Sequence, residues 1–234
     1  MSQIPLLEVP APETPDGIDL YCCGVEEMAD RVSRPPALIV ADPPWHYSQA
    51  PGHSANPENH YSSMTDDEIA WLLAASWHYA APASRLAVWC TWPKLGQWQA
   101  AIDRQAGNWR WRYVSGGAWT KMGGSPGTGY HWIGQSEICL LYVKGTGLCT
   151  EWGPLTNAHT SRRQAHSEKP ADWMAQWIER WTRPGDLVCD LFAGLAPLAR
   201  ACIKTGRDYV GAEIDPDRHR QAVDRIALYR PDRA

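Results

Sequence analysis

Short apolar runs separated by helical patterns limit the folds that are open to this chain. The runs are apolar on both faces, as is typical of strands buried in a parallel sheet. They are "PALIVA" (36–41), "RLAVWCT" (85–91), "EICLLYV" (137–143), "DLVCDL" (186–191) and "DYVGAEI" (208–214). Helices are predicted at 65–81, from Pro93 to near Gly107, at 169–182, at 196–205 and at 216–229. This alternation predicts an α/β fold, with a mostly parallel sheet covered by helices on both faces.

Two of these helices carry specific signals. Thr65, followed by Glu68 three residues later, forms a capping-box pattern at the start of one helix. In the segment "KPADWMAQWIERWT" (169–182), Pro170 lies near the first turn. Helical spacing there puts one set of apolar side chains on one side, namely Trp173, Trp177, Ile178 and Trp181.

The pattern predicts a Pro-rich, poorly ordered lead-in at residues 1–16 and a single domain at 17–234. The lead-in has no basic stretch followed by an apolar one, so it is not expected to be a secretion signal. Three long irregular segments remain, at 46–62, 115–135 and 145–168. The middle one combines glycines with aromatics, and we predict that it forms a mobile lid.

Composition excludes several classes of protein. No apolar run approaches about 18 residues, so no membrane span is expected. Seven cysteines without a Cys-x-x-Cys pair predict reduced thiols, a cytoplasmic location and no zinc site. A net charge of −4 argues against coating nucleic acid by charge alone, although basic residues gather at Arg162, Arg163, Lys169 and Arg183. Of the 14 tryptophans, most are expected in the core and a few as stacking surfaces.

The stretch "ADPPW" (41–45) directly follows an apolar run. Two prolines fix two φ angles and push Asp42 out of the helical region, so the segment is expected to be stiff and extended. Asp42 then lies at the carboxyl end of a strand, where open α/β sheets bind ligands. The amine of adenine is a poor nucleophile, and acceptors for its N–H groups, here the Asp42 carboxylate and the Pro43 carbonyl, would favour attack. Trp45 could stack on a flipped base; the alternative is a Pro-rich turn with an Asp cap.

Residues 186–215 read as a strand, a turn of small residues, a helix ending at Gly206 and a strand ending in an acid. Such a unit binds a nucleoside when the turn admits the ligand and Glu213, nineteen residues after Gly194, accepts from ribose hydroxyls. The alternative is an αβ turn that merely packs tightly.

In "HSEKP" (166–170), His166 and Lys169 precede a helix N-terminus, which suits an anion; the alternative is a solvated loop charge.

Taken together, seven segments occur in the order expected of one family. They are "ADPPW", "HYSSMTDDEI" (60–69), "LAVWCTW" (86–92), "WTKMGGSPGTGYHW" (119–132), "EICLLYVKG" (137–145), "HSEKP" and "DLFAG" (190–194). From about residue 18 to 226 the chain resembles the N6-adenine methyltransferases with a DPPW motif. That family includes the catalytic subunit of the eukaryotic messenger-RNA adenosine methyltransferase and bacterial and phage DNA-modifying relatives.

The resemblance implies a class I, Rossmann-like methyltransferase domain that uses S-adenosylmethionine and no metal, with the catalytic motif ahead of the cofactor motif. The implied catalytic residues are Asp42, Pro43, Pro44 and Trp45. The implied cofactor residues are Asp42, His166, Lys169, Asp190, Phe192, Gly194 and Glu213. The implied substrate residues are Tyr47, Tyr61, Trp119, Lys121 and Tyr130.

The chain departs from the family pattern at three places near the implied cofactor. Gly24 occupies a position where relatives often carry an aspartate. Ala196 and Pro197 alter the cofactor turn, and Ala212 stands where some relatives have asparagine. These departures predict weaker cofactor binding, or a need for a partner that orders the loops.

The leading hypothesis is therefore methyl transfer to N6 of adenine in nucleic acid, with DNA preferred over RNA. A second hypothesis is a non-catalytic subunit that keeps the fold and binds nucleic acid. A third is transfer to N4 of cytosine, which Asp42 disfavours because relatives with that activity usually have serine there. A homodimer and a heteromeric partner subunit both remain open.

Overall fold

The computed structural model describes residues 14–47, 63–123, 133–146, 155–162 and 168–230. Within these residues the strands are β1 (Ile18–Tyr21), β2 (Leu38–Ala41), β3 (Arg85–Cys90), β4 (Arg112–Met122), β5 (Ser136–Val143), β6 (Ala158–Arg162), β7 (Leu187–Asp190) and β8 (Asp208–Ala212). The helices are α1 (Val25–Ala29), α2 (Asp66–Tyr79), the 3₁₀ helix η2 (Trp92–Lys94), α3 (Leu95–Arg104), α4 (Ala171–Trp181), α5 (Pro197–Thr205) and α6 (Pro216–Leu228). The strands form one sheet in the order β1-β8-β7-β2-β3-β5-β4-β6.

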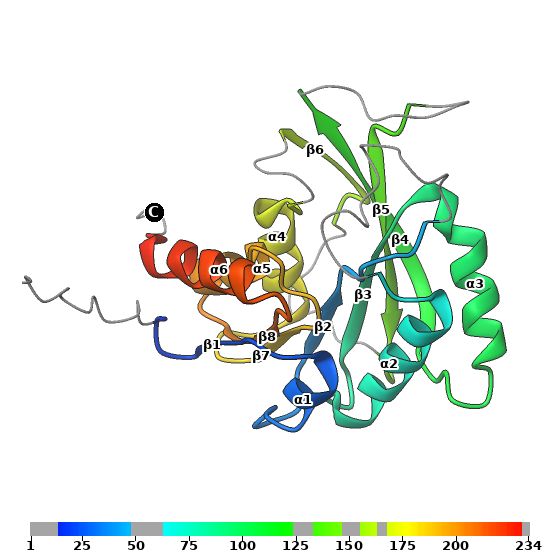
Figure 1. Cartoon of the computed structure of the whole chain (residues 1–234), viewed down its shortest axis with the longest axis horizontal. Coiled ribbons are helices and arrows are strands. Elements are labelled where there is room, and N and C mark those ends of the chain that lie inside the picture. Colours follow the sequence, from blue (N-terminus) through cyan, green and yellow to red (C-terminus); the bar gives the residue numbers. More distant parts are fainter. Residues whose placement is uncertain (1–13, 48–62, 124–132, 147–154, 163–167, 231–234) are drawn as a thin grey trace, which may run out of the picture.

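The sheet lies between two layers of helices, with α1, α2 and α3 on one face and α4, α5 and α6 on the other (Figure 1). Side chains alternate between the two cores, as the two-residue period of a strand requires. In β2, Ile39 and Ala41 join the core under α1–α3, whereas Leu38 and Val40 join the core under α4–α6. The prediction of a sheet covered on both faces is confirmed.

All five predicted strands are present, and one of them runs in an unexpected direction. β1, β8, β7, β2 and β3 pair in parallel, and β6 is parallel to β4. β5 is antiparallel to both of its neighbours, β3 and β4. Reading "EICLLYV" as a parallel strand was therefore wrong, because a strand buried on both faces is apolar in either direction.

The sequence also concealed strands in segments that we expected to be irregular. Residues 115–122, the start of the predicted lid, belong to β4, and part of the segment 145–168 forms β6. β4 contains Gly116 and Gly117 and is largely exposed in its first half, so it lacks the apolar pattern of a buried strand. Gly117 is required there because a Cβ would lie 2.9 Å from the Trp173 ring of α4. Residues 124–132 of the predicted lid lie outside the described residues.

The predicted helices form with the expected ends. α5 ends at Gly206, which adopts a left-handed conformation, and α4 buries Trp173, Trp177 and Ile178. In the part of the chain that the structure describes, no helix is both long enough and apolar enough to cross a membrane.

The capping box of α2 is present in full. The Thr65 hydroxyl oxygen accepts from the backbone N–H of Glu68 at 3.3 Å, and the Glu68 carboxylate accepts from the backbone N–H of Thr65 at 2.8 Å. These bonds satisfy two donors at the start of the helix and hold the pKa of Glu68 below its usual value.

We predict that Thr65→Ala lowers the free energy of unfolding by about 1 kcal/mol, because the helix loses its cap. In a chain of this size the melting temperature should fall by about 2–4 °C. Urea denaturation measures the loss, and Thr65→Ser, which keeps the hydroxyl, is the matched control. An equal loss in both variants would contradict a role for the cap.

Candidate active site

A cavity of about 1360 Å³ opens where four adjacent parallel strands end. Its wall includes Asp42 after β2, Thr91 after β3, Leu191 after β7 and Glu213 after β8. Parallel strands carry their carboxyl ends to one edge of the sheet, which is the usual ligand site of open α/β folds. The volume exceeds that of a typical small-molecule pocket, so the cavity has room for more than one ligand.

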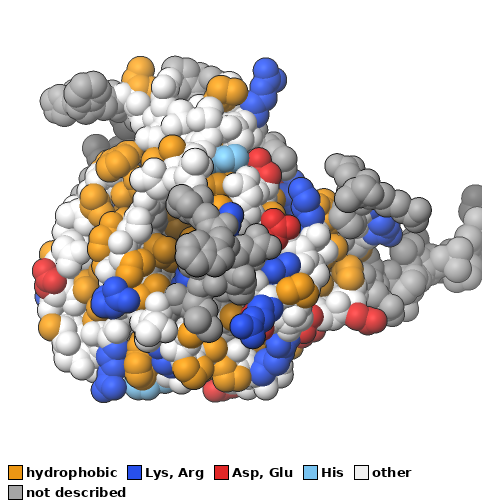
Figure 2. All heavy atoms as spheres, turned by 180° about the vertical axis from the view of Figure 1, so that it is seen from behind, with side chains coloured by type: hydrophobic (Ala, Val, Ile, Leu, Met, Phe, Trp, Pro, Cys, Tyr) orange, Lys and Arg blue, Asp and Glu red, His pale blue; other side chains and the backbone are white. Residues whose placement is uncertain are grey.

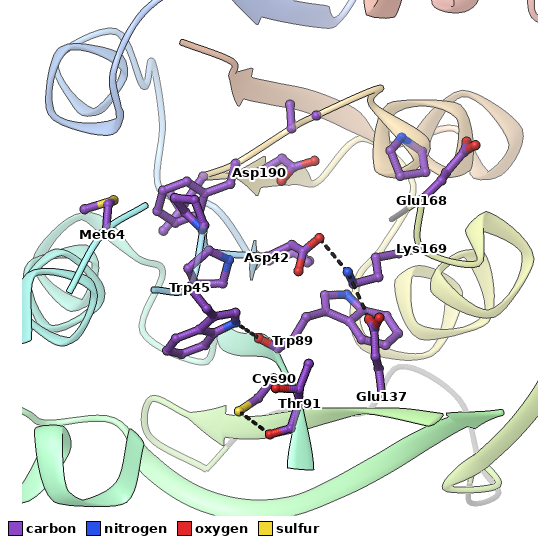
Figure 3. Close-up of a pocket in the computed structure, with 18 of the residues that line it drawn as sticks. Asp42, Trp45, Met64, Trp89, Cys90, Thr91, Glu137, Glu168, Lys169 and Asp190 are labelled. Carbon is purple, nitrogen blue, oxygen red and sulfur yellow. Dashed lines mark hydrogen bonds and ion pairs between the residues drawn. The ribbon is translucent and has the colours of Figure 1, made fainter. Parts of the chain in front are cut away.

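The segment Asp42–Trp45 is held on both sides. The backbone N–H of Met64 donates to the Pro44 carbonyl at 2.8 Å, and the Trp45 indole N–H donates to the Trp89 carbonyl at 3.1 Å (Figure 3). The Pro43 carbonyl accepts from the backbone N–H of Trp45 at 2.8 Å, a bond within the segment and not to a neighbouring strand. This bond closes a three-residue γ-turn, which the prolines favour because they restrict the backbone. A carbonyl has two lone pairs, so the Pro43 oxygen can still accept a second donor.

Trp45 lines the cavity but is mostly buried, with its ring edge against Trp98 at 5.4 Å between centroids. Its position in the core explains why the DPPW segment is rigid. Stacking of a base on Trp45 stays a prediction, and only a small part of the ring surface is open to it.

Asp42 belongs to a chain of four alternating charges. Lys169 Nζ lies 2.6 Å from Asp42 Oδ2 and 3.0 Å from Glu137 Oε2 (Figure 3). Lys121 forms an ion pair with Glu137 Oε1. The four side chains come from four separate segments: the end of β2, the start of α4, β5 and β4. The ammonium of Lys169 also lies over the Trp89 ring, 5.5 Å from its centroid. The sequence interpretation placed three of these residues near the site and missed Glu137.

The pKa values of Asp42, Glu137 and Lys169 depend on one another. Burial raises the pKa of Asp42, the Lys169 ammonium opposes that rise, and Glu137 adds to it. Burial also disfavours the Glu137 carboxylate, but Lys169 and Lys121 together hold its pKa at about 2. Burial opposes the charge on Lys169, yet the two carboxylates raise its pKa above the usual value. The charge cluster therefore keeps Lys169 charged next to the carboxylate of Asp42, which gains a proton more readily than a free aspartate does.

A buried ion cluster holds the segment that carries Lys169. The side chain of Glu168 is almost wholly buried and pairs with Arg200 of α5 and, at 3.2 Å, with Arg225 of α6. Removing one member of a buried ion cluster leaves an uncompensated charge, which is strongly destabilising. Glu168 therefore fixes the backbone next to Lys169. It was not among the predicted residues, although a glutamate next to a predicted site lysine is a usable signal.

The predicted cofactor residues Asp190, Phe192, Gly194 and Glu213 all line the cavity on the side of β7 and β8. The Tyr209 hydroxyl donates to Asp190 Oδ2 at 3.2 Å, and the backbone N–H of Asp215 donates to Glu213 Oε1 at 2.9 Å. Burial raises the pKa of Asp190 to about 7 despite the Tyr209 bond, and burial also raises the pKa of Glu213. Two carboxyl groups thus face the cavity on this side, where apolar side chains and the charged Asp215 and Arg218 complete the lining.

The altered cofactor turn has a left-handed residue before α5, a conformation that glycine adopts most easily. Ala196 adopts φ 52° and ψ 50°, a left-handed conformation that costs an alanine about 1–2 kcal/mol. Its side chain is fully buried, and Pro197 then begins α5 at a position that favours proline. The departures at 196 and 197 therefore change the residues but preserve a turn into the helix.

The predicted substrate residues divide into three groups. Tyr47 and Lys121 line the cavity, and the Tyr47 hydroxyl lies 2.9 Å from Thr91 Oγ1. Trp119 does not line this cavity: it is 1% exposed, packs edge-on against Trp89 and donates to Ser161 Oγ at 3.0 Å. Its position in β4 turns the ring into the core under α4, away from the wall of this cavity, and its role beside the substrate stays a prediction. Tyr61, Tyr130 and His166 lie outside the described residues.

Residues 144–224 match the N6_N4_Mtase family model, described as "DNA methylase". This segment contains α4, β7, the turn, α5 and β8, and it does not include Asp42. A protein of Escherichia coli (strain K12) named "Putative methylase YubD" is 33% identical over 69 residues, which is 30% of this chain and 30% of that protein.

Solved structures share the fold over nearly the whole chain. The M1.HpyAVI–SAM complex aligns with a TM-score of 0.68 at 16% identity, covering 89% of this chain and 99% of that one. TTHA0409 of Thermus thermophilus, described as a putative DNA modification methylase complexed with S-adenosyl-L-methionine, aligns at 0.62, with 20% identity and coverage of 89% and 93%. The cytosine-N4-specific PvuII DNA methyltransferase aligns at 0.63, with 14% identity and coverage of 95% and 91%. The fold is that of the class I methyltransferases, and the resemblance to DNA methylases is confirmed.

We predict that Asp190→Asn changes how stability depends on pH. Because the native pKa of about 7 lies above the unfolded value, the native state binds a proton that is lost as pH rises. Asp190 therefore stabilises the protein at pH 5 relative to pH 8, by about 2–3 kcal/mol for this shift. Chemical denaturation of the variant and the wild type at both pH values measures the difference. An equal change in both proteins would show that Asp190 has no raised pKa.

Proposed function

We propose that this protein transfers a methyl group from S-adenosylmethionine to an exocyclic amine of a nucleic-acid base, with N6 of adenine in DNA as the acceptor. The observation that carries the proposal is Asp42, held by Lys169 at 2.6 Å in a cavity large enough for a cofactor and a base. The fold, and the family match over residues 144–224, support the reaction class.

The residues on the β7–β8 side fit the cofactor. S-adenosylmethionine supplies a methyl group activated by a positively charged sulfur. Its ammonium and ribose hydroxyls are donors, and the carboxyl groups of Asp190 and Glu213 are acceptors at the ends of neighbouring strands. Phe192 and Ile214 provide apolar surface for its ring system. The solved neighbours described as SAM complexes support this assignment.

Asp42 and its lysine act on the acceptor. Lys169 contacts Asp42 through Oδ2, and the carboxylate can accept an N–H of the target amine through its other oxygen. Such a bond favours a pyramidal nitrogen whose lone pair is free to attack. As the new C–N bond formed, the bond from the methyl carbon to sulfur would break, leaving a neutral thioether. The nitrogen would then lose a proton, and Asp42, whose pKa burial raises, is suited to take up that proton. The rigid DPPW segment keeps the carboxylate of Asp42 in place. Alignment of the target amine with the methyl donor would supply much of the rate.

The choice of adenine rests on the resemblance carried by "ADPPW", and the choice of DNA is supported by the match to a family model described as "DNA methylase". Cytosine N4 is the alternative acceptor, supported by the fold match to PvuII DNA methyltransferase. On the face shown in Figure 2, Lys and Arg side chains are interspersed with Asp and Glu and form no single basic surface. We expect target recognition to come from the cavity rim, or from a partner subunit or a second copy of the chain.

A non-catalytic, nucleic-acid-binding subunit is the second candidate, favoured by Ala196 and Pro197 in the cofactor turn. The cluster of four largely buried charges that includes Asp42 counts against it, because a scaffold gains nothing from so costly a cluster. Titration with labelled cofactor separates the two: binding of nucleic acid without any binding of cofactor would favour the scaffold.

The direct test is incubation of the full chain with labelled S-adenosylmethionine and single- and double-stranded DNA and RNA. Digestion followed by mass spectrometry then identifies the modified nucleoside. N6-methyladenine in DNA is the expected product. N4-methylcytosine would move the acceptor to cytosine, and unmodified nucleosides in every sample would overturn the proposed activity.

We predict that Asp42→Asn lowers the methylation rate about 10²–10⁴-fold, the usual effect of a positioned acid or base. Asparagine keeps the shape of the side chain but removes its charge. The control is Asp103→Asn, which changes an exposed aspartate of α3. Melting temperatures verify that both variants fold. A wild-type rate in Asp42→Asn would remove Asp42 from the mechanism.

We predict that Lys169→Met weakens cofactor binding about tenfold or more, because a buried charge-assisted contact is lost and Asp42 is no longer held. Isothermal titration calorimetry measures the dissociation constant. Lys204→Met, which alters an exposed lysine of α5, is the control. An unchanged dissociation constant in Lys169→Met would count against the assignment of Lys169.

A further inference from the structure

Trp92 stands apart from most of the described tryptophans. Trp45, Trp89 and Trp98 are nearly or fully buried, whereas the side chain of Trp92 is 54% exposed and lines the cavity. It begins the 3₁₀ helix η2, two residues after β3 ends. An indole left half in water at the edge of a cavity costs hydrophobic free energy unless something covers it.

The Trp92 ring is held in one orientation. Its Nε1 donates to Ser136 Oγ at 2.9 Å, and Ser136 is the first residue of β5, next to Glu137. Pro93 follows directly and restricts the backbone. Because its one donor is already used, the indole can offer a ligand only its apolar, aromatic surface. A rigid aromatic surface of this kind suits a flat ring system better than a polar group.

The sheet register shows how far Trp92 lies from Asp42. Ala41 of β2 pairs with Val88 of β3, so Asp42 is one residue beyond this level and Trp92 is four residues beyond it. The difference of three residues is at most about 10 Å along the strand direction, because Trp92 already belongs to the 3₁₀ helix, which rises less per residue than a strand. A base whose amine reaches Asp42 lies deeper in the cavity, and Trp92 is placed at the rim to meet the next nucleotide of the strand.

Other apolar side chains also line the cavity. Pro93, Leu72 and Met64 line the cavity, as does Ile133, whose side chain is also 54% exposed. The methyl transfer proposed above makes no use of the Trp92 ring. Trp92 follows β3, which is separated from β7 and β8 by β2, so it lies on the acceptor side of the cavity, away from Asp190 and Glu213.

We propose that Trp92 stacks on the nucleobase adjacent to the target base, and so holds the strand while the target amine reaches Asp42. The inference rests on the proposed function and adds the residue that reads the neighbouring nucleotide. Stacking accepts every base, but its strength differs among them, so Trp92 would give a preference for particular neighbours without hydrogen-bonded readout.

The test uses the full chain and fluorescently labelled oligonucleotides, single- and double-stranded, that carry one target base. Fluorescence anisotropy measures their dissociation constants for wild type, Trp92→Ala and Trp92→Phe. Trp71→Ala is the matched control, because Trp71 on α2 is 50% exposed and does not line the cavity. A second set of oligonucleotides has an abasic site on one or the other side of the target.

Trp92→Ala should weaken oligonucleotide binding about tenfold, with cofactor affinity and melting temperature unchanged. Trp92→Phe and Trp71→Ala should bind nearly as wild type does. An abasic site on one side should weaken wild-type binding by a similar factor and leave Trp92→Ala unaffected, as a double-mutant cycle requires for direct contact.

Two results would overturn the inference while leaving the proposed function intact: wild-type affinity in Trp92→Ala, or an equal loss from the abasic site in both proteins. A loss in Trp71→Ala as large as in Trp92→Ala would also count against a specific stack. If the wild type bound none of the oligonucleotides, the proposed nucleic-acid substrate and this inference would both fail.

Discussion

The alternation of charge along Asp42, Lys169, Glu137 and Lys121 holds the site together. Each lysine lies between or beside carboxylates, so four largely buried charges sum to zero. No short segment could supply this arrangement, because the four residues come from β2, β4, β5 and the start of α4. A charge cluster of this kind is costly unless every member is paired. The sheet therefore has to form in the observed order for the acceptor at Asp42 to be held.

The tryptophan-rich core supports that cluster from below. Trp89 of β3 lies under the ammonium of Lys169 and contacts Trp119, Trp173 and Trp177. Its backbone carbonyl accepts from Trp45, so the same residue contacts both the DPPW segment and the lysine. Large rings in close packing transmit displacement, since protein interiors have few voids. The unusual tryptophan content thus contributes to the rigidity of the site as well as to stability.

Much of the site was predictable because its residues sit at strand ends, and strand ends can be read from apolar runs. Asp42 follows such a run directly, Asp190 and Glu213 are next to last in theirs, and the structure brings all three to one cavity. Glu137 was missed because it is the second residue of an antiparallel strand, so the rule for carboxyl ends does not apply to it. The segment around Trp119 was expected to be irregular for a related reason: it reads as a Gly-rich loop, but pairing with β5 and β6 makes it a strand.

Local sequence was enough to predict the layered α/β architecture, the helix ends and the DPPW segment, because these depend on periodicity, capping and the stereochemistry of proline. The direction of β5, the existence of β4 and β6 as strands, and the partners of Lys169 emerged only when the chain was folded. Those features depend on pairing between segments far apart in the chain. The apolar pattern of a buried strand is the same for either strand direction, and an ion pair leaves no local signal in the sequence. Packing likewise decided which tryptophans are core and which are surface, as the contrast between buried Trp119 and half-exposed Trp92 shows.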